Sequence, residues 1–336
     1  MPYVDLSSDP GAVRRIFVTL GLAEDHEDVN AQPLTGGVSS GIYQVDLRSG
    51  SYCVKQALPR LKVEQVWEAP VRRNFYEWNW FRVAGRVCPD AVPPMVAQDA
   101  LAGLFAMEYL DPSLFPVWKE QLREGLADPA VAEAVAERLV LIHNRTAGDH
   151  QIARMFGSDD DFTAIRLEPY LLATAQKHPD LAAPLKFLVQ ETLGMKLALV
   201  HGDVSPKNIL IGRRGPVFLD AECAWYGDPA FDLAFCLNHL LLKCMLNRRA
   251  ITRFLTCYDR FAEAYLRAVN WELRDELEPR AACLLPALML GRVDGKSPVE
   301  YITEEPKERV RKVARSLLTD RVERLDAVRD AWAAEL

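Results

Sequence analysis

Two short segments, 201–208 (HGDVSPKN) and 220–222 (DAE), carry the most informative side chains of this 336-residue chain. The first contains a carboxylate, Asp203, and a carboxamide, Asn208; the second contains two further carboxylates, Asp220 and Glu222. Phosphoryl transfer from ATP needs such a set. One carboxylate orients the attacking hydroxyl and accepts its proton, while the others, with an amide oxygen, hold Mg²⁺ against the phosphates.

The alternative for these segments is a surface hairpin that is rich in Asp and Asn for ordinary reasons. An HGD triplet alone would leave that alternative open. Here, however, an Asn follows five residues after Asp203, and a carboxylate pair begins seventeen residues after it. This combination favours the phosphoryl-transfer interpretation.

The elements that must position these groups are two short apolar stretches, 208–211 and 216–219, which we predict to be strands. The sequence GRRG at 212–215 is typical of a hairpin turn. Because the groups flank the two strands, the hairpin would place them at one edge.

A glycine- and serine-rich turn precedes a predicted strand at 41–47. Such a turn can bring backbone N–H groups and hydroxyls onto phosphate oxygens, where a Cβ would clash. Lys55 lies in the following strand, 52–57, and the metal-binding groups downstream favour a phosphate-binding role for it over plain exposure. The candidate phosphate-binding residues of the turn are Gly36, Gly37, Ser39 and Ser40.

A buried Lys55 needs a carboxylate partner, which we expect to come from the next helix, at about 71–85. Glu77 is the preferred candidate, and Glu64 and Glu68 are the alternatives. They lie in a stretch interrupted by proline, which is less able to fix a side chain.

The predicted strand 104–109 ends before Asp111-Pro112, where the sequence changes from mixed α/β to mainly helical. We therefore expect a boundary there, with one domain at 1–110 and the other at 111–336. Backbone groups of Glu108 and Tyr109, at this boundary, are candidates for contacts with the adenine edge.

Composition narrows the class of protein. The net charge is −7, which argues against a nucleic-acid partner or an anionic membrane surface and is compatible with cationic substrates. The seven cysteines show no C-x-x-C spacing, and no signal peptide or membrane-spanning run is visible, so we expect a cytoplasmic protein. The charged segment 305–332 is expected to form a solvated helix on the larger domain, with a homodimerising coil as the alternative.

In order along nearly the whole chain, these motifs resemble those of the aminoglycoside phosphotransferase and choline kinase superfamily. The resemblance implies a two-lobed, protein-kinase-like α+β fold with a small β-rich N-lobe and a larger helical C-lobe. It also implies ATP and Mg²⁺ as cofactors and roles for individual residues. Asp203 would be the catalytic base, Asn208, Asp220 and Glu222 would bind metal, and Lys55, held by Glu77, would bind the α- and β-phosphates.

Segments 54–77 and 220–227 look most like the methylthioribose kinase branch of that superfamily. Asn208, where that branch usually carries Ser, and the lack of paired C-terminal arginines depart from its pattern. The resemblance implies transfer to a hydroxyl of a small, sugar-like acceptor. An aminoglycoside or amino-alcohol acceptor is the alternative, and a regulatory pseudokinase is an alternative of another class.

Two arginines of the helical domain, Arg166 and Arg292, are candidates for binding acceptor hydroxyls, because a guanidinium presents several fixed donors. The alternative for each is an ordinary ion pair with a neighbour such as Glu168 or Asp294.

The sequence yields one prediction about catalysis. Asp203→Asn should retain ATP binding and lose turnover by about 10²- to 10⁴-fold, because the amide does not accept the acceptor's proton. Steady-state kinetics beside ATP titration checks this, and transfer at nearly the wild-type rate would remove Asp203 from the role.

Overall fold

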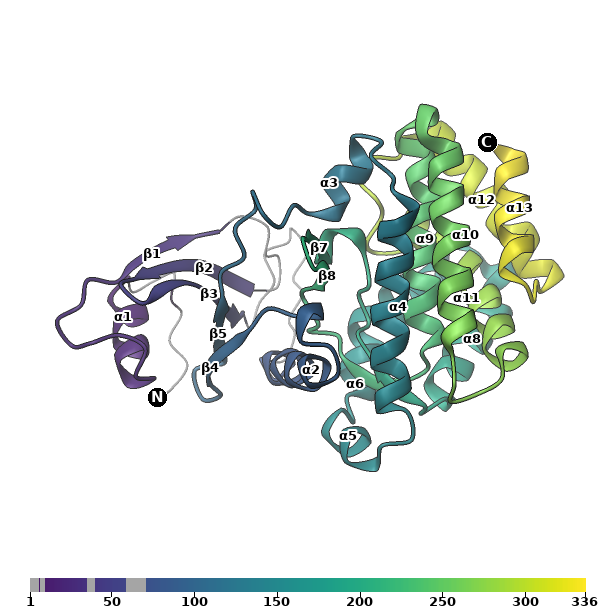
Figure 1. Cartoon of the computed structure of the whole chain (residues 1–336). Helices are drawn as coiled ribbons and strands as arrows, with labels where there is room; N and C mark the ends of the chain where they lie inside the picture. Colours follow the sequence, from purple (N-terminus) through teal and green to yellow (C-terminus); the bar gives the residue numbers. More distant parts are fainter. Residues whose placement is uncertain (1–5, 7–9, 35–39, 59–70) are drawn as a thin grey trace. The chain divides into compact units, whose positions relative to one another are not determined.

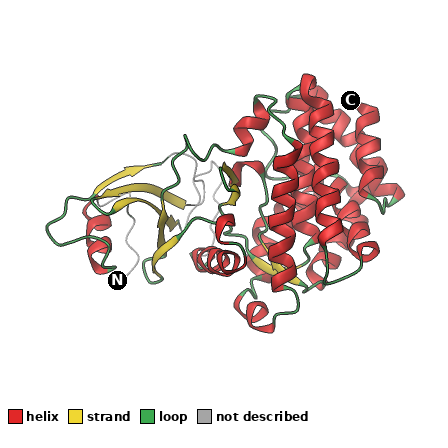
Figure 2. Ribbon diagram, in the orientation of Figure 1, coloured by secondary structure: helices red, strands yellow, loops and turns green. Residues whose placement is uncertain are grey.

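A computed structural model describes residues 6, 10–34, 40–58 and 71–336, and in it the chain divides into two compact units, Met1–Leu114 and Phe115–Leu336 (Figure 1). The first unit is built around a sheet and the second is mainly helical (Figure 2). The α+β class expected from the sequence is therefore present. From the sequence we expected the boundary between the two units after residue 110, whereas the units divide after Leu114.

The first unit is built on a five-stranded antiparallel sheet in the order β1-β2-β3-β5-β4. Its strands are β1 (Asn30–Pro33), β2 (Ser40–Leu47), β3 (Gly50–Ala57), β4 (Met95–Asp99) and β5 (Leu104–Glu108). Strands β2, β3 and β5 match stretches predicted from apolar and β-branched residues. The short strands β1 (NAQP) and β4 (MVAQD) were not predicted, and pairing with their neighbours stabilises them.

Helix α1 (Pro10–Thr19) packs its apolar face on this sheet. Ile16 and Phe17 of the helix are buried with Val45 of β2 and Val54 of β3. Helix α2 (Arg73–Val87) buries Trp80 and Phe81, and Phe81 makes an edge-to-face contact with Phe105 of β5, with ring centroids 6.1 Å apart.

The second unit contains most of the helices. They are α3 (Trp118–Arg123), α4 (Pro129–Thr146), α5 (His150–Met155), α6 (Asp159–Phe162), the π-helix η2 (Thr163–Leu172), α7 (Ala173–Lys177), α8 (Ala182–Gly194), α9 (Ala230–Leu246), α10 (Ile251–Ala268), α11 (Arg274–Asp294), α12 (Glu304–Asp320) and α13 (Leu325–Glu335). The 3₁₀ turns of the chain are η1 (Pro89–Ala91), η3 (Pro179–Leu181), η4 (Pro206–Asn208) and η5 (Arg248–Ala250).

Helix α9 forms the centre of this unit, packed against α10 and α11. Nearly every residue of α9 is buried, as its largely apolar sequence requires. Helix α13 reaches this core, because the indole of Trp332 donates a hydrogen bond to the Leu241 carbonyl at 3.0 Å.

Two small antiparallel ladders interrupt the helices. Strands β6 (Ala198–Val200) and β9 (Trp225–Gly227) pair with each other, and β7 (Ile209–Gly212) pairs with β8 (Gly215–Phe218) as the predicted hairpin.

The structure differs from expectation in two helical segments. The C-terminal segment forms two helices instead of one, because Arg321 adopts a positive φ of 46° and ends α12. The other difference is η2, a π-helix that contains Pro169. Proline has no N–H to donate to the helix, and the wider turn of a π-helix accommodates the missing hydrogen bond. Among the described residues, no helix is long and apolar enough to span a membrane.

Candidate active site

The small ladders bring the two carboxylate-bearing segments together. Strand β6 leads into the 201–208 loop, and its last residue, Val200, pairs with Trp225, which follows the 219–224 segment. At the other end, the Leu219 N–H donates to the Asn208 carbonyl at 2.8 Å. The 201–208 loop and the 219–224 segment are therefore held side by side by the flanking ladder and this hydrogen bond.

Gly202 is required where these two segments touch. Its φ is +79°, a region that side chains with a Cβ rarely adopt, and an added Cβ would lie 2.6 Å from the Cys223 carbonyl oxygen. The close approach of the loop to Cys223 therefore depends on glycine.

Asp232 of α9 holds the loop from behind. Its carboxylate accepts hydrogen bonds from the backbone N–H groups of His201, at 2.7 Å, and Gly202, at 2.8 Å. His143 of α4 lies 3.2 Å from the same carboxylate and bonds Tyr265 of α10 through its other nitrogen, at 2.6 Å. His143 is thus a buried core histidine with both ring nitrogens satisfied, and Asp232 braces the loop.

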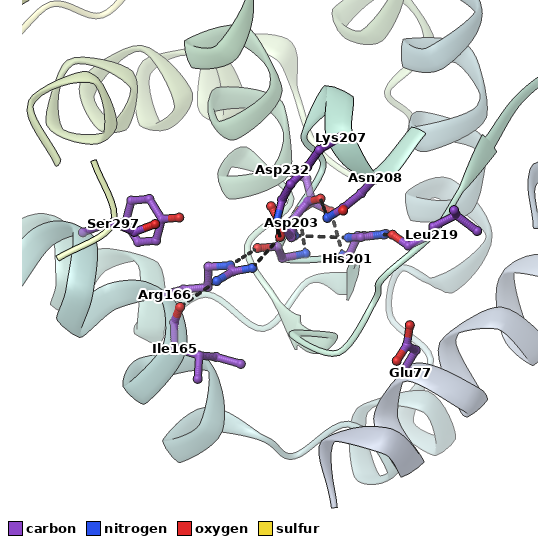
Figure 3. Close-up of polar contacts among 12 residues, drawn as sticks. Glu77, Ile165, Arg166, His201, Asp203, Lys207, Asn208, Leu219, Asp232 and Ser297 are labelled. Atoms are coloured by element: carbon purple, nitrogen blue, oxygen red, sulfur yellow. Dashed lines mark hydrogen bonds and ion pairs between the residues drawn. The ribbon is translucent and has the colours of Figure 1, made fainter. Parts of the chain in front are cut away.

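Asp203 is buried and forms ion pairs with two cationic side chains. An Arg166 guanidinium nitrogen lies 2.8 Å from the carboxylate, and the Lys207 ammonium lies 3.3 Å from it (Figure 3). Burial alone would raise the pKa of Asp203, but Lys207 and Arg166 outweigh it and hold that pKa well below its usual range. Asp203 is accordingly ionised at neutral pH.

Arg166 was expected to bind acceptor hydroxyls, with an ion pair to Glu168 as the alternative, and the structure pairs it with Asp203 instead of Glu168. Besides Asp203, its side chain donates to the carbonyls of Gly202, at 2.5 Å, and Ile165, at 2.7 Å. Glu168 instead pairs with Lys296 at 2.7 Å. The π-helix sets this arrangement, because it determines which face of the segment Arg166 occupies.

The predicted metal-binding residues lie together at one end of the β7–β8 hairpin. Asn208 donates from its amide nitrogen to the Asp203 carbonyl at 3.1 Å, an orientation that leaves its amide oxygen for another partner. Asp220 follows β8 at a positive φ of 64°, and Glu222 lies two residues beyond. In the described part of the chain, no three His, Cys, Asp or Glu side chains form a metal-binding group. Two carboxylates and an amide oxygen nevertheless suit Mg²⁺, which takes few protein ligands and completes its shell with phosphate oxygens and water.

In the first unit, the predicted pair of Lys55 and Glu77 is present. The Lys55 ammonium lies 2.8 Å from the Glu77 carboxylate, and both side chains are almost fully buried. The alternatives Glu64 and Glu68 lie outside the described residues, as do Gly36, Gly37 and Ser39 of the predicted phosphate-binding turn.

The other predicted nucleotide contacts also fall in the first unit. Ser40 is buried at the start of β2, opposite Ala57. The N–H of Glu108 donates to the Pro94 carbonyl at 2.9 Å, and that of Tyr109 donates to the Ser51 carbonyl at 3.1 Å. These two N–H groups are already satisfied, so an adenine contact here would use a carbonyl oxygen.

Arg292, near the end of α11, does not pair with Asp294 as its alternative interpretation held. It donates to the Tyr170 hydroxyl at 3.3 Å and to the Ser297 hydroxyl at 3.0 Å. Asp294 pairs with Arg311 at 2.7 Å and with His178 at 2.9 Å.

Sequence reasoning missed Lys207 as a neighbour of the Asp203 carboxylate. Its position four residues after Asp203, inside the same motif, was the available signal. It also did not single out the buried His239 and Lys243 of α9, because their neighbours are distant in sequence.

A separate apolar cavity of about 340 Å³ lies among α8, α11 and α12. Phe187, Leu188 and Leu317 contribute to its lining, and none of its lining residues belongs to the 201–208 loop or the 219–224 segment. This cavity is therefore separate from the candidate site.

The strand-rich unit with its buried Lys–Glu pair and the helical unit with its HGD loop define a protein-kinase-like phosphotransferase fold. A model of the phosphotransferase enzyme family (APH) matches residues 30–279, and this chain belongs to that family.

The curated relatives of this chain include methylthioribose kinases. Methylthioribose kinase 1 of Oryza sativa subsp. japonica is 28% identical over 233 residues, which cover 60% of this chain and 53% of that protein. The methylthioribose kinase of Erwinia tasmaniensis is 26% identical over 216 residues, covering 56% and 54%. The chain thus spans about half the length of the curated relatives it matches.

Solved structures share the fold at low sequence identity. An amicoumacin kinase in complex with AMP-PNP, Ca²⁺ and Ami has a TM-score of 0.54 at 13% identity, covering 94% of each chain. The Plasmodium vivax ethanolamine kinase has a TM-score of 0.53 at 13% identity, covering 88% of this chain and 84% of its own. An ADP-bound aminoglycoside phosphotransferase has a TM-score of 0.51 at 14% identity, covering 92% and 97%.

The Asp232 contacts generate a prediction about stability and catalysis. Asp232→Asn replaces one accepting oxygen by a donor beside the His201 and Gly202 N–H groups. We expect the free energy of unfolding to fall by about 1.5–3 kcal/mol, the range for a hydrogen bond to a charged group, together with a loss of kcat. Urea unfolding and steady-state kinetics measure the two effects.

The matched control is Asp326→Asn, which removes an exposed pair with Arg324. Exposed ion pairs contribute little to stability, so the free energy of unfolding should change by less than about 1 kcal/mol. Equal effects of the two substitutions would show that Asp232 has no special part in holding the loop.

The metal-binding residues generate a second prediction. Asp220→Asn keeps a side chain that tolerates the positive φ, whereas Ala would add backbone strain. The variant should lose the extra thermal stabilisation that ATP gives when Mg²⁺ is present, because the ion loses a charged ligand. A thermal-shift titration with ATP, with and without Mg²⁺, measures this. Glu222→Gln should lose less, and an undiminished Mg²⁺-dependent shift in Asp220→Asn would refute the assignment.

Proposed function

We propose that this protein is an ATP- and Mg²⁺-dependent small-molecule kinase that transfers the γ-phosphoryl group to a hydroxyl of a sugar-like metabolite. The observation that carries the proposal is the environment of Asp203. The residue is buried, kept ionised by two cations, and placed on a loop that Asp232 fixes through two backbone hydrogen bonds.

In the proposed reaction, the acceptor oxygen forms a bond to the γ-phosphorus as the bond to the bridging β–γ oxygen breaks, and ADP leaves. Asp203 accepts a hydrogen bond from the attacking hydroxyl and receives its proton. Because its pKa is held low, Asp203 is a weak base, so its main contribution is to orient the hydroxyl. This suits a loose transition state, in which little proton transfer is needed before the phosphorus–oxygen bond breaks.

The other residues supply binding and electrostatics. Asn208, Asp220 and Glu222 would hold Mg²⁺, which neutralises charge that develops on the phosphates. Lys55, held by Glu77, would bind phosphate oxygens. Lys207, which is exposed beside Asp203, would place a further cation near the phosphoryl group during its transfer.

A sugar-like acceptor is favoured by the methylthioribose kinases among the relatives. Aminoglycoside and amino-alcohol acceptors are the runner-up class, since kinases of both kinds share the fold. A regulatory pseudokinase is disfavoured, because every residue type that catalysis needs is present.

A panel assay tests the proposal. The protein is incubated with Mg-ATP and sugars, thiosugars, amino alcohols and aminoglycosides, and ADP release is measured. We expect turnover with at least one sugar-like compound and its loss in Asp203→Asn. Turnover with aminoglycosides or amino alcohols alone would select the runner-up class. Binding of Mg-ATP with no turnover on any compound would support the pseudokinase instead.

A further inference from the structure

One face of α9 continues from the loop-bracing Asp232 with three buried side chains at four-residue spacing, Phe235, His239 and Lys243. Residues four apart lie on one face of a helix, so these three form a row. The His239 ring stands edge-on to the Phe235 ring, with centroids 5.2 Å apart. The row therefore runs from the 201–208 loop to Lys243.

Lys243 is a buried cation without a carboxylate partner. Its residue is only 2% exposed, its ammonium lies 4.4 Å from the centre of the Tyr301 ring, and no ion pair to it exists in the described part of the chain. Burial lowers the pKa of Lys243 to about 8. Removing an ammonium from water without an anion is costly, so this position is poorly explained as structural packing.

Arg292 approaches the same region from α11. Its contacts are neutral oxygens, the Tyr170 hydroxyl and the hydroxyl and carbonyl of Ser297, and its Nε is buried without a partner. The hydroxyl of Tyr301 is likewise buried and without a partner. A buried polar group that lacks a partner in the protein calls for an explanation, and a bound water, ion or ligand supplies one.

These groups are contiguous with Asp203. The Arg166 guanidinium, which pairs with Asp203, lies 5.9 Å from the centre of the Tyr170 ring, and the Arg292 guanidinium lies 5.7 Å from it. His239 is close enough to Arg292, Lys243 and Asp203 for all three charges to affect its pKa, which burial and the two cations lower well below the usual value.

The side chains of Lys243 and Arg292 are both cationic, although the whole chain has a net charge of −7. The nearby carboxylates are already engaged. Asp203 pairs with Arg166 and Lys207, and Glu168 pairs with Lys296. Glu120 pairs with Arg123, and Glu300, with a side chain that is 87% exposed, pairs with Lys119. Arg292 and Lys243 therefore remain for a ligand, and His239 lies with them.

We infer that the acceptor carries an anionic group, a carboxylate or a phosphate, which Arg292 and Lys243 bind while its hydroxyl faces Asp203. This inference rests on the proposed kinase function and narrows its substrate class. A guanidinium and an ammonium match carboxylate and phosphate oxygens, and the tyrosine hydroxyls add neutral donors. Cationic aminoglycosides and amino alcohols would meet like charges and be disfavoured.

The test uses four probes that share one sugar skeleton and differ in charge: glucose, gluconate, glucose 6-phosphate and glucosamine. ADP release gives kcat/KM for each, and thermal shift in the presence of Mg-AMP-PNP gives binding without turnover. We expect gluconate or glucose 6-phosphate to be preferred over glucose, and glucosamine to be the poorest. The comparison of the two anions distinguishes a carboxylate from a phosphate.

Variants locate the anion. Arg292→Gln and Lys243→Met should each raise KM for the preferred anionic probe by about 30-fold or more, as expected when a buried charge loses its partner, with a smaller change in kcat. Arg292→Lys should recover part of the loss. Arg324→Gln, which removes an arginine from an exposed pair with Asp326, is the matched control and should leave KM unchanged.

The outcomes separate this inference from the kinase proposal. Higher kcat/KM for glucose or glucosamine than for both anions would overturn the anionic acceptor and leave the kinase standing. If no probe is phosphorylated, thermal shift decides. Stabilisation by an anionic probe that Arg292→Gln abolishes supports the site, and no stabilisation by either anion overturns it. Failure of the kinase itself would appear separately, as loss of turnover on every compound of the wider panel.

Discussion

The arrangement of the candidate site depends on one buried carboxylate, Asp232, which accepts two backbone hydrogen bonds from the start of the 201–208 loop. A loop that carries charged side chains has no reason of its own to adopt one conformation, because its ordering costs entropy. Asp232 offsets that cost from a helix that is buried along nearly its whole length, and His143 and Tyr265 tie the carboxylate to two further helices. The helical core thus determines the position of Asp203 by fixing the backbone of its loop.

Once the loop is fixed, the charges around Asp203 determine its chemistry. Arg166 and Lys207 keep the carboxylate ionised in a buried position where burial alone would favour the protonated form. Arg166 also donates to the Gly202 carbonyl, so one side chain sets both the charge state of Asp203 and the path of the backbone beside it. The same guanidinium lies over the Tyr170 ring, and the Arg292 guanidinium lies near that ring as well. Asp203 and the proposed acceptor region are therefore parts of one electrostatic arrangement.

The contrast between the whole chain and its site shows how little net charge says about a substrate. An acidic chain with a net charge of −7 is compatible with cationic ligands, yet the groups near Asp203 that lack carboxylate partners are cations. The electrostatic field at a buried position is set mainly by the nearest charges, which water screens little there. Carboxylates on the surface are screened by the solvent. Family membership leaves this point open, since kinases of aminoglycosides, ethanolamine and methylthioribose are all among the similar proteins.

The sequence by itself determined the elements whose signals are local. The hairpin at 209–218 follows from two short apolar runs around GRRG, α4 follows from its Asp-Pro start and apolar stripe, and the pair of Lys55 and Glu77 follows from a strand lysine and the next helix. The tertiary structure decided what depends on residues distant in sequence. The partner of Arg166 is 37 positions away and is selected by a π-helix that no local pattern announced. Lys243 and Arg292 acquire significance only because α9 and α11 pack together, which buries Lys243 and the Nε of Arg292 and leaves both side chains without an anion among the described residues.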